Sequence, residues 1–219
     1  MTTQGYGAYI QEKIQDWPVN QPITTALISA ALSDAFGIDM KSAKKITNVN
    51  LKRLADKGEL THIQRGVYGK VKQSLFGIVE PNADQITLKL LLRDGDKVIG
   101  FTIGPTLLNT IGLCSWMPRD YHVATNNYRY AIPSGTHIRV YKPVTAINNE
   151  NAPYLQVLEA IVAMTQYHVD AEKPNELLRN LLRERNLNDE SLILYARKYY
   201  GQEIAQKVLD IVPGCSGDS

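Results

Sequence analysis

Residues 40–68 read MKSAKKITNVNLKRLADKGELTHIQRGVY. Mostly apolar residues recur in the first half of this stretch at gaps of three and four, which places them on one face of a helix. The positions that we expect to be buried on this face are Met40, Ala43, Thr47, Leu51 and Leu54. Gly58 is expected to end the helix, because glycine readily adopts the left-handed conformation that a helix C-terminus needs.

A polar series follows the same gaps, shifted by one residue, and forms a second stripe about 100° around the helix. It consists of Lys41, Lys45, Asn48 and Lys52. Lys44 and Arg53 add charge beside it. The window 41–72 holds nine Lys or Arg against Asp56 and Glu59, a net charge of +7, whereas the whole chain carries +2. The basic charge is therefore local, as expected of a nucleic-acid footprint on a nearly neutral protein.

The second half of the stretch predicts a hairpin. Residues 59–64 form the first strand, Arg65 and Gly66 the turn, and Val67 begins the return strand. A basic helix, a glycine stop and a hairpin with an arginine at its tip are typical of a winged helix-turn-helix. In that fold the recognition helix lies in a major groove, and the wing reaches phosphate or a minor groove.

We therefore predict a set of DNA-contacting residues on the basic helix and at the hairpin tip. They are Lys41, Lys44, Lys45, Asn48, Lys52, Arg53 and Arg65. Asparagine can pair bidentately with adenine, and lysine with guanine. The alternative interpretation is a solvated helix face and a solvated turn, since charge runs often are that. The sequence leaves open which residue reads a base and where the recognition helix starts.

Two helices are expected before the basic one. The first covers residues 6–17, and Thr24 or Thr25 caps the second, which Gly37 closes. The residues of the second helix that we expect to face inward are Ala26, Leu27, Ala30, Ala31 and Ala35. Asp39 is expected to cap the basic helix, where a negative charge suits the helix N-terminus. Three helices and a hairpin are the order of a winged helix.

Residues 70–81 are interpreted as the exit from this domain, so we divide the chain into 1–80 and 81–219. A helix is favoured over a strand at 85–92. The middle segment then alternates short elements, with strands expected at 97–102, 121–125, 128–132 and 137–141 and a helix at 106–113. From Pro153 onward four amphipathic helices follow. The predicted fold class is α+β: a winged helix-turn-helix followed by a mixed α/β domain that ends in helices.

Composition limits the class of protein. The chain has 219 residues and is 44% hydrophobic, which suffices for real cores. Its cysteines, Cys114 and Cys215, indicate no disulfide framework, so a reducing cytoplasm is expected. No apolar run approaches the ~20 residues that span a bilayer, and no secretory signal is visible, so no membrane partner is expected.

No catalytic or metal-binding pattern stands out. His62, His122, His137 and His168 are far apart in sequence, and Cys114 has no neighbouring cysteine partner. Asp94 and Asp96 flank a glycine and are interpreted as turn formers. The sequence shows neither a phosphate-binding loop nor a nucleophile elbow. We therefore expect no enzyme activity, no cofactor and no metal.

Three blocks of the chain resemble the AbiEi family of type IV antitoxins. LKRLADKGELTHIQRGVYGK (51–70) is similar to the N-terminal winged helix of that family. VIGFTIGPTLLNTIGLCSWMPRDYHVATNN (98–127) resembles its second domain, in which a Gly-rich start, a small helix ending in Gly-Leu, a proline and a strand follow one another. LILYARKYYGQEIAQKVLDIV (192–212) is similar to its closing helix pair. Together the blocks cover 71 of the 219 residues, about a third of the chain.

The resemblance implies a two-gene module of phage defence. The winged helix of such an antitoxin binds double-stranded operator DNA of its own operon and represses it, and the antitoxin counteracts a nucleotidyltransferase-like toxin, directly or indirectly. Two alternatives stay open: a winged-helix transcription regulator with a C-terminal ligand or dimerisation domain, and a nuclease or nucleotidyl-transferring enzyme that a winged helix targets. From Glu150 onward eleven acidic residues oppose seven basic ones, which suggests different partners for the two ends. The oligomeric state stays open.

Overall fold

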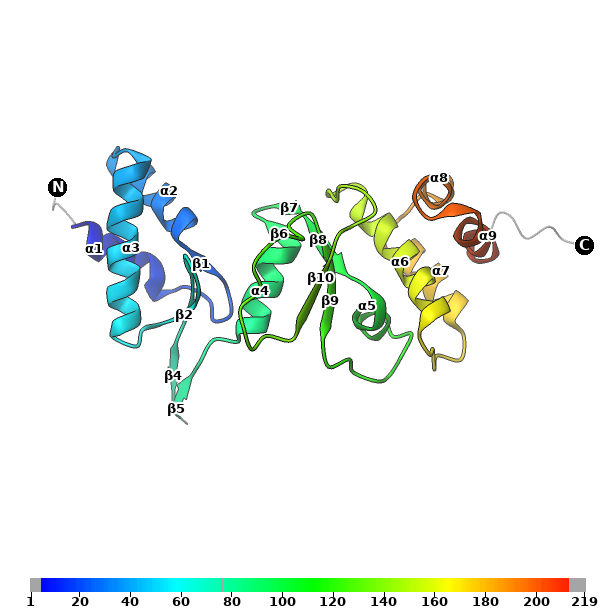
Figure 1. Cartoon of the computed structure of the whole chain (residues 1–219), viewed down its shortest axis with the longest axis horizontal. Coiled ribbons are helices and arrows are strands. Elements are labelled where there is room, and N and C mark those ends of the chain that lie inside the picture. The colour runs from blue at the N-terminus through cyan, green and yellow to red at the C-terminus, as the bar shows by residue number, and fades with distance from the viewer. Residues whose placement is uncertain (1–4, 76, 213–219) are drawn as a thin grey trace, which may run out of the picture. The chain divides into compact units, whose positions relative to one another are not determined.

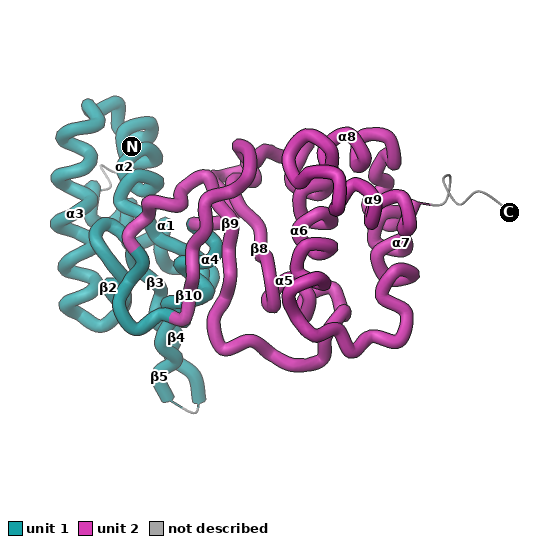
Figure 2. Tube along the Cα trace, turned by 45° about the vertical axis from the view of Figure 1, so that its right-hand side comes forward, with its two compact units in different colours: residues 1–90, 132–136 teal, residues 91–131, 137–219 magenta. Residues whose placement is uncertain are grey.

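The computed structural model describes residues 5–75 and 77–212 of the chain (Figure 1). Cys215 lies outside these residues. The chain divides into two compact units (Figure 2). The first comprises residues 1–90 and 132–136, and the second comprises 91–131 and 137–219. The first unit thus extends beyond residue 80, the boundary drawn from the sequence. Helices and small sheets occur in both units, which agrees with a mixed α+β class.

The first unit begins with three helices and a small antiparallel sheet. Its elements are α1 (Tyr6–Gln15), β1 (Ile23–Thr24), α2 (Thr25–Phe36), α3 (Met40–Asp56), β2 (Leu60–Gln64) and β3 (Val67–Lys70). The sheet order is β1-β3-β2, so the return strand of the hairpin lies between its partner and the short strand that precedes α2. The three helices and the hairpin therefore occur where the sequence predicts them.

Local signals in the sequence explain where these helices start and stop. The Thr24 hydroxyl accepts a hydrogen bond from the Leu27 N–H at 3.2 Å and caps α2. The Asp39 carboxylate accepts one from the Ser42 N–H at 3.0 Å and caps α3. Such caps satisfy backbone donors that the first turn leaves free. Gly58 has a φ of +73°, so the predicted left-handed glycine does follow α3.

The core of the first unit confirms most of the predicted face of α3. The buried residues are Ile10, Ile14, Ile23, Ile28, Leu32, Ala43, Leu51, Leu54, Leu60 and Tyr68, and Thr47 is buried beside them on α3. Met40 was expected there but is 43% exposed, because it is the first residue of α3 and lies at the end of the stripe.

The prediction for the inner face of α2 was wrong for three of its five residues, whereas Ala30 and Ala31 are half-buried. Ala26, Leu27 and Ala35 are exposed, and Ile28, Ser29 and Leu32 are buried instead. Burying two large aliphatic side chains removes more apolar surface from water than burying alanines does, and this favours the face that carries Ile28 and Leu32.

A second hairpin and a helix complete the main part of the first unit. The hairpin consists of β4 (Lys72–Ser74) and β5 (Gly77–Val79), which pair antiparallel and project from the helices of the unit (Figure 1). This hairpin was not predicted from the sequence, in which residues 70–81 are interpreted only as the exit from the first domain. The helix is α4 (Ala83–Leu92), as favoured there. A Cβ atom at Gly69 would lie 2.6 Å from both Ile86 and Pro81, so the start of α4 packs directly on the backbone of β3.

The second unit contains a three-stranded mixed sheet. A small hairpin of β6 (Arg93–Asp94) and β7 (Lys97–Val98) leads into it. The sheet has the order β10-β9-β8 and consists of β8 (Gly100–Thr102), β9 (Tyr121–Thr125) and β10 (Ile138–Tyr141), and α5 (Gly104–Thr110) follows β8. β8 and β9 are antiparallel, whereas β9 and β10 are parallel.

The strand expected at residues 128–132 does not form. Because β9 and β10 are parallel, the chain has to cross over between them instead of turning back in a tight hairpin. The crossover begins with a turn in which the Asn127 carbonyl accepts a hydrogen bond from the Tyr130 N–H at 2.8 Å. Alternating polar and aromatic residues in this crossover imitate the pattern of a return strand.

Four helices close the second unit, as the sequence predicts: α6 (Ala152–Gln166), α7 (Pro174–Glu184), α8 (Asp189–Tyr199) and α9 (Gly201–Ile211). Their core includes Leu158, Ile161, Leu178, Leu192 and Val208. The Tyr200 hydroxyl donates a hydrogen bond to Glu159 at 2.9 Å, and burial raises the pKa of this carboxyl group. Among the described residues, no helix is long and apolar enough to cross a membrane.

Replacing Leu51 tests the packing of α3. Leu51→Ala removes a fully buried side chain from the core of the first unit, and we expect a loss of about 2–5 kcal/mol in the free energy of unfolding. Lys52→Ala, at the neighbouring exposed position, should change it by less than about 0.5 kcal/mol. Urea unfolding, followed by Trp17 fluorescence in a Trp116→Phe background, measures both. Equal stability of the two variants would show that α3 does not pack as described.

Candidate nucleic-acid interface

The exposed face of α3 gathers most of the predicted contact residues. Its exposed polar members are Lys41, Lys44, Lys45, Asn48 and Lys52. At about 100° per residue, these five side chains fall within an arc of about 100° that Lys44 and Lys45 bound. Arg53 directly follows Lys52 and therefore lies about 100° from it, outside this arc. The helix thus groups five of its six predicted residues and separates Arg53 from them.

The β2–β3 turn lies against this face through α2. The Thr25 N–H donates to the Gly66 carbonyl at 2.9 Å, and the Thr25 hydroxyl donates to the Asn48 side-chain oxygen at 3.1 Å. The turn, the start of α2 and the middle of α3 therefore meet at one threonine. Arg65 directly precedes Gly66 in this turn and is exposed.

Asn48 keeps hydrogen-bonding capacity in this arrangement. Its side-chain oxygen uses one lone pair for the Thr25 hydroxyl and retains a second, and its amide nitrogen has no protein partner among the described residues. An asparagine that offers one donor and one acceptor on an exposed helix face has what bidentate pairing with adenine requires.

The lysines of this face are not neutralised within the described part of the chain. Lys41, Lys44, Lys45 and Lys52 form no ion pair there. Asp39 stands at the start of α3, but its carboxylate is occupied by Ser42, whose hydrogen bonds lower the pKa of Asp39. The positive charge of the face is therefore available to an external anion.

Two residues of this surface escaped the sequence analysis. Thr25 was considered only as a helix cap, yet it connects the turn to Asn48. Val49 lies on α3 and is 50% exposed. Because Val49 is apolar but lies outside the buried stripe of α3, its exposure could have been predicted from the sequence.

No helix in the described part of the second unit carries a comparable group of exposed lysines. His122 lies 3.4 Å from the Tyr141 hydroxyl, and burial, together with the nearby Arg139, lowers its pKa. Arg139 pairs with Asp120 at 2.6 Å. Asp94 and Asp96 flank Gly95 in the β6–β7 turn, as expected of turn formers. Across the described residues, no group of three or more His, Cys, Asp or Glu could hold a metal ion.

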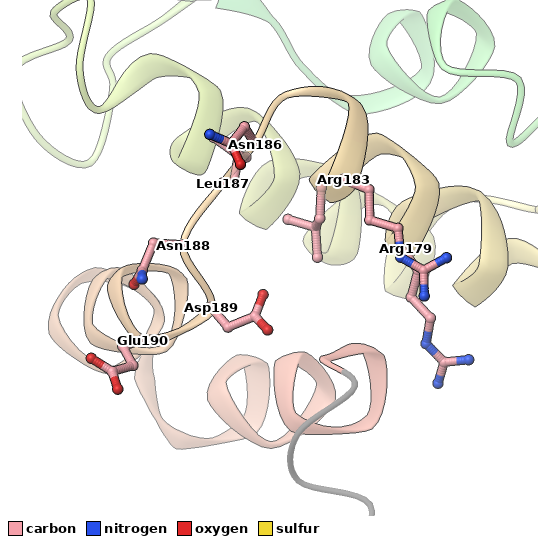
Figure 3. Close-up of a pocket in the computed structure, with 8 residues that line it drawn as sticks. Arg179, Arg183, Asn186, Leu187, Asn188, Asp189 and Glu190 are labelled. Carbon is pink, nitrogen blue, oxygen red and sulfur yellow. The ribbon is translucent and has the colours of Figure 1, made fainter.

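A hollow of about 770 Å³ lies between α7 and α8 (Figure 3). Arg179 and Arg183 line it on one side and Asp189 and Glu190 on the other. Arg179 donates to the carbonyls of Ile211 and Asp210 at 2.7 and 2.9 Å and so holds the end of α9. This arginine thus has a structural role in the helical part of the unit.

Comparison of the chain with protein-family models and with curated proteins finds no match. The exposed face of α3 and the adjoining β2–β3 turn are therefore the candidate functional site.

Gly66 tests whether the turn has the described conformation. Its φ is +73°, and a Cβ would meet only Thr25 at an ordinary 3.5 Å, so the cost of a side chain comes from the backbone. We expect Gly66→Ala to lower the free energy of unfolding by about 1–2 kcal/mol, and Gly66→Asn to lower it less, because asparagine tolerates the left-handed region. Urea unfolding of both variants measures the difference. Wild-type stability of Gly66→Ala would contradict the turn geometry.

Proposed function

We propose that the first unit is a winged helix-turn-helix that binds double-stranded DNA. The observation that carries the proposal is the grouping of Asn48 with four lysines on the exposed face of α3, with the β2–β3 turn held at the middle of that face. Within the described residues these lysines form no ion pair. In this arrangement α3 enters the major groove, where Asn48 contacts a base edge and the lysines contact phosphates. Arg65 at the turn reaches the flanking backbone or minor groove.

The element order supports the same proposal. Helix, short strand, helix, helix and hairpin follow one another, and the short strand β1 pairs with the return strand β3. This pairing fixes the hairpin beside α2 and α3, as a wing requires. Residues 41–72 carry a net charge of +7 in a chain whose net charge is only +2, which favours a DNA footprint over a generally basic protein.

We further propose that the protein is the autorepressing antitoxin of a type IV toxin–antitoxin system. The three sequence blocks that resemble the AbiEi family support this step, and the bound DNA is then the operator of its own operon. The second unit serves to counteract a nucleotidyltransferase-like toxin, directly or indirectly. Its acidic balance after Glu150 is consistent with a task other than DNA binding.

Salt dependence tests the DNA interface. Each phosphate contact contributes a slope of about −0.9 in log K against log salt, so the full-length protein should bind the DNA upstream of its own gene much more weakly as salt rises. Lys45→Ala should reduce the magnitude of this slope by about one unit. Arg53→Ala, on the same helix but outside the basic arc, should change the slope less. Fluorescence anisotropy across a salt series measures all three proteins.

Two results would contradict this interface. Affinity that stays flat from low to moderate salt would exclude phosphate contacts altogether. Equal slopes for the Lys45→Ala and Arg53→Ala variants would show that the described face of α3 is not the one that lies on DNA.

A repression and rescue assay tests the division of labour. A variant with Lys44→Ala, Lys45→Ala and Lys52→Ala should remain folded, since all three side chains are exposed. It should lose repression of a reporter under its own promoter, yet still relieve growth arrest by the neighbouring toxin gene. Simultaneous loss of repression and rescue in a folded variant would mean that the two functions are not separate. A neighbourhood without such a toxin gene would remove the antitoxin part of the proposal and leave DNA binding standing.

A further inference from the structure

The outer edge of β8 in the second unit leaves backbone groups without partners. β8 is the edge strand of the sheet. The Ile99 carbonyl accepts a hydrogen bond from Asn126 at 2.8 Å, and the Ile103 N–H donates to a β9 carbonyl at 2.9 Å. The N–H and C=O of one peptide group point in opposite directions, so the Gly100 N–H and the Thr102 C=O point away from β9.

The remaining groups of the edge follow from the register. Phe101 pairs with Ala124 between those two bonds, so the Gly100 carbonyl and the Thr102 N–H also point outward. Within the described residues none of these four groups has a hydrogen-bond partner. A row of alternating free donors and acceptors is a template for another strand.

A groove of about 450 Å³ runs along this edge, within the 300–1,000 Å³ typical of ligand sites. Residues of β8 form one wall. The rest comes from the end of α4, the β6–β7 hairpin, α5, the start of α6 with the loop before it, and Arg185 after α7. The accessible apolar members of the lining are the half-buried Leu92, Val98 and Pro153, whereas Gly100 and Phe101 are buried. A strand that binds here therefore finds apolar contacts beside the free backbone groups.

The charged residues that line the groove are both positive. They are Arg93 and Arg185, and no acidic residue lines it. Arg185 donates a hydrogen bond to Gln156 at 2.6 Å, which holds its guanidinium beside the groove without neutralising it. Arg93 is exposed and forms no ion pair in the described part of the chain. The groove thus complements an acidic ligand.

We propose that this groove binds an extended acidic segment of a partner protein, which adds to β8 as a further strand. Strand addition uses backbone hydrogen bonds for affinity and side-chain contacts for specificity. The edge itself favours a peptide over a phosphate: it presents two carbonyls as well as two N–H groups, and a phosphate, which only accepts, would be repelled by the carbonyls. The carboxylates of the segment pair with the two arginines at the rim.

Binding of a synthetic strand to the ¹⁵N-labelled full-length protein tests the proposal. The probe is acetyl-Val-Glu-Val-Glu-Val-Thr-amide, and it should shift the amide resonances of Gly100 and Thr102. Arg93→Glu should weaken the affinity about tenfold or more, because it places like charges together. Arg119→Glu, at another exposed arginine of the same unit that lies outside the groove, should leave it unchanged.

Two control peptides separate the causes. A version N-methylated at alternate residues lacks the donors for strand addition, and a version with lysine at both glutamate positions lacks the acidic charge; both should lose binding. Unchanged affinity of either control would overturn the proposal. So would unshifted Gly100 and Thr102 amides at millimolar acidic peptide, or shifts of those amides by duplex DNA that the acidic peptide does not reverse.

Discussion

The arrangement of the first unit depends on the two hydrogen bonds of Thr25. Its backbone N–H holds the hairpin turn at Gly66, and its hydroxyl holds Asn48 on α3. One residue therefore joins the turn to the basic helix and adds to the β1–β3 pairing that holds the hairpin. Neither bond is strong, since a typical intramolecular hydrogen bond contributes only about 0.5–1.5 kcal/mol net. Their importance is geometric, because they fix three elements that together present one surface.

The parts of the fold that the sequence predicted are those encoded by neighbouring residues. Caps such as Asp39, glycine stops such as Gly58 and the spacing of Leu51 and Leu54 act within one or two turns of chain, so a single sequence reveals them. The parts that it missed depend on distant partners. The direction of β10 relative to β9 decides whether residues 128–132 form a strand, and no local pattern contains that direction.

The candidate interface divides in the same way. Helical spacing alone brings Lys41, Lys45 and Lys52 together, so the basic face could be predicted. Arg53 directly follows Lys52, so the helix places it about 100° from Lys52 and outside that face. The contact between Thr25 and Asn48 joins residues that are 23 positions apart, and only the folded chain shows that it exists. Sequence therefore predicts the charge of the surface, and the structure adds its shape.

The close contact at Gly69 has an evolutionary consequence. A side chain at this position would place its Cβ 2.6 Å from both Ile86 and Pro81, nearer than real Cβ atoms come to their neighbours. The end of the Ile86 side chain can turn aside, but the Pro81 ring is fixed to the backbone, so a side chain at position 69 would displace the segment that leads into α4. In homologues that keep this helix on this strand, position 69 is therefore confined to glycine. Substitutions at other positions can accumulate until two sequences no longer resemble each other. Glycine at position 69 is still expected wherever α4 packs on β3 in this way.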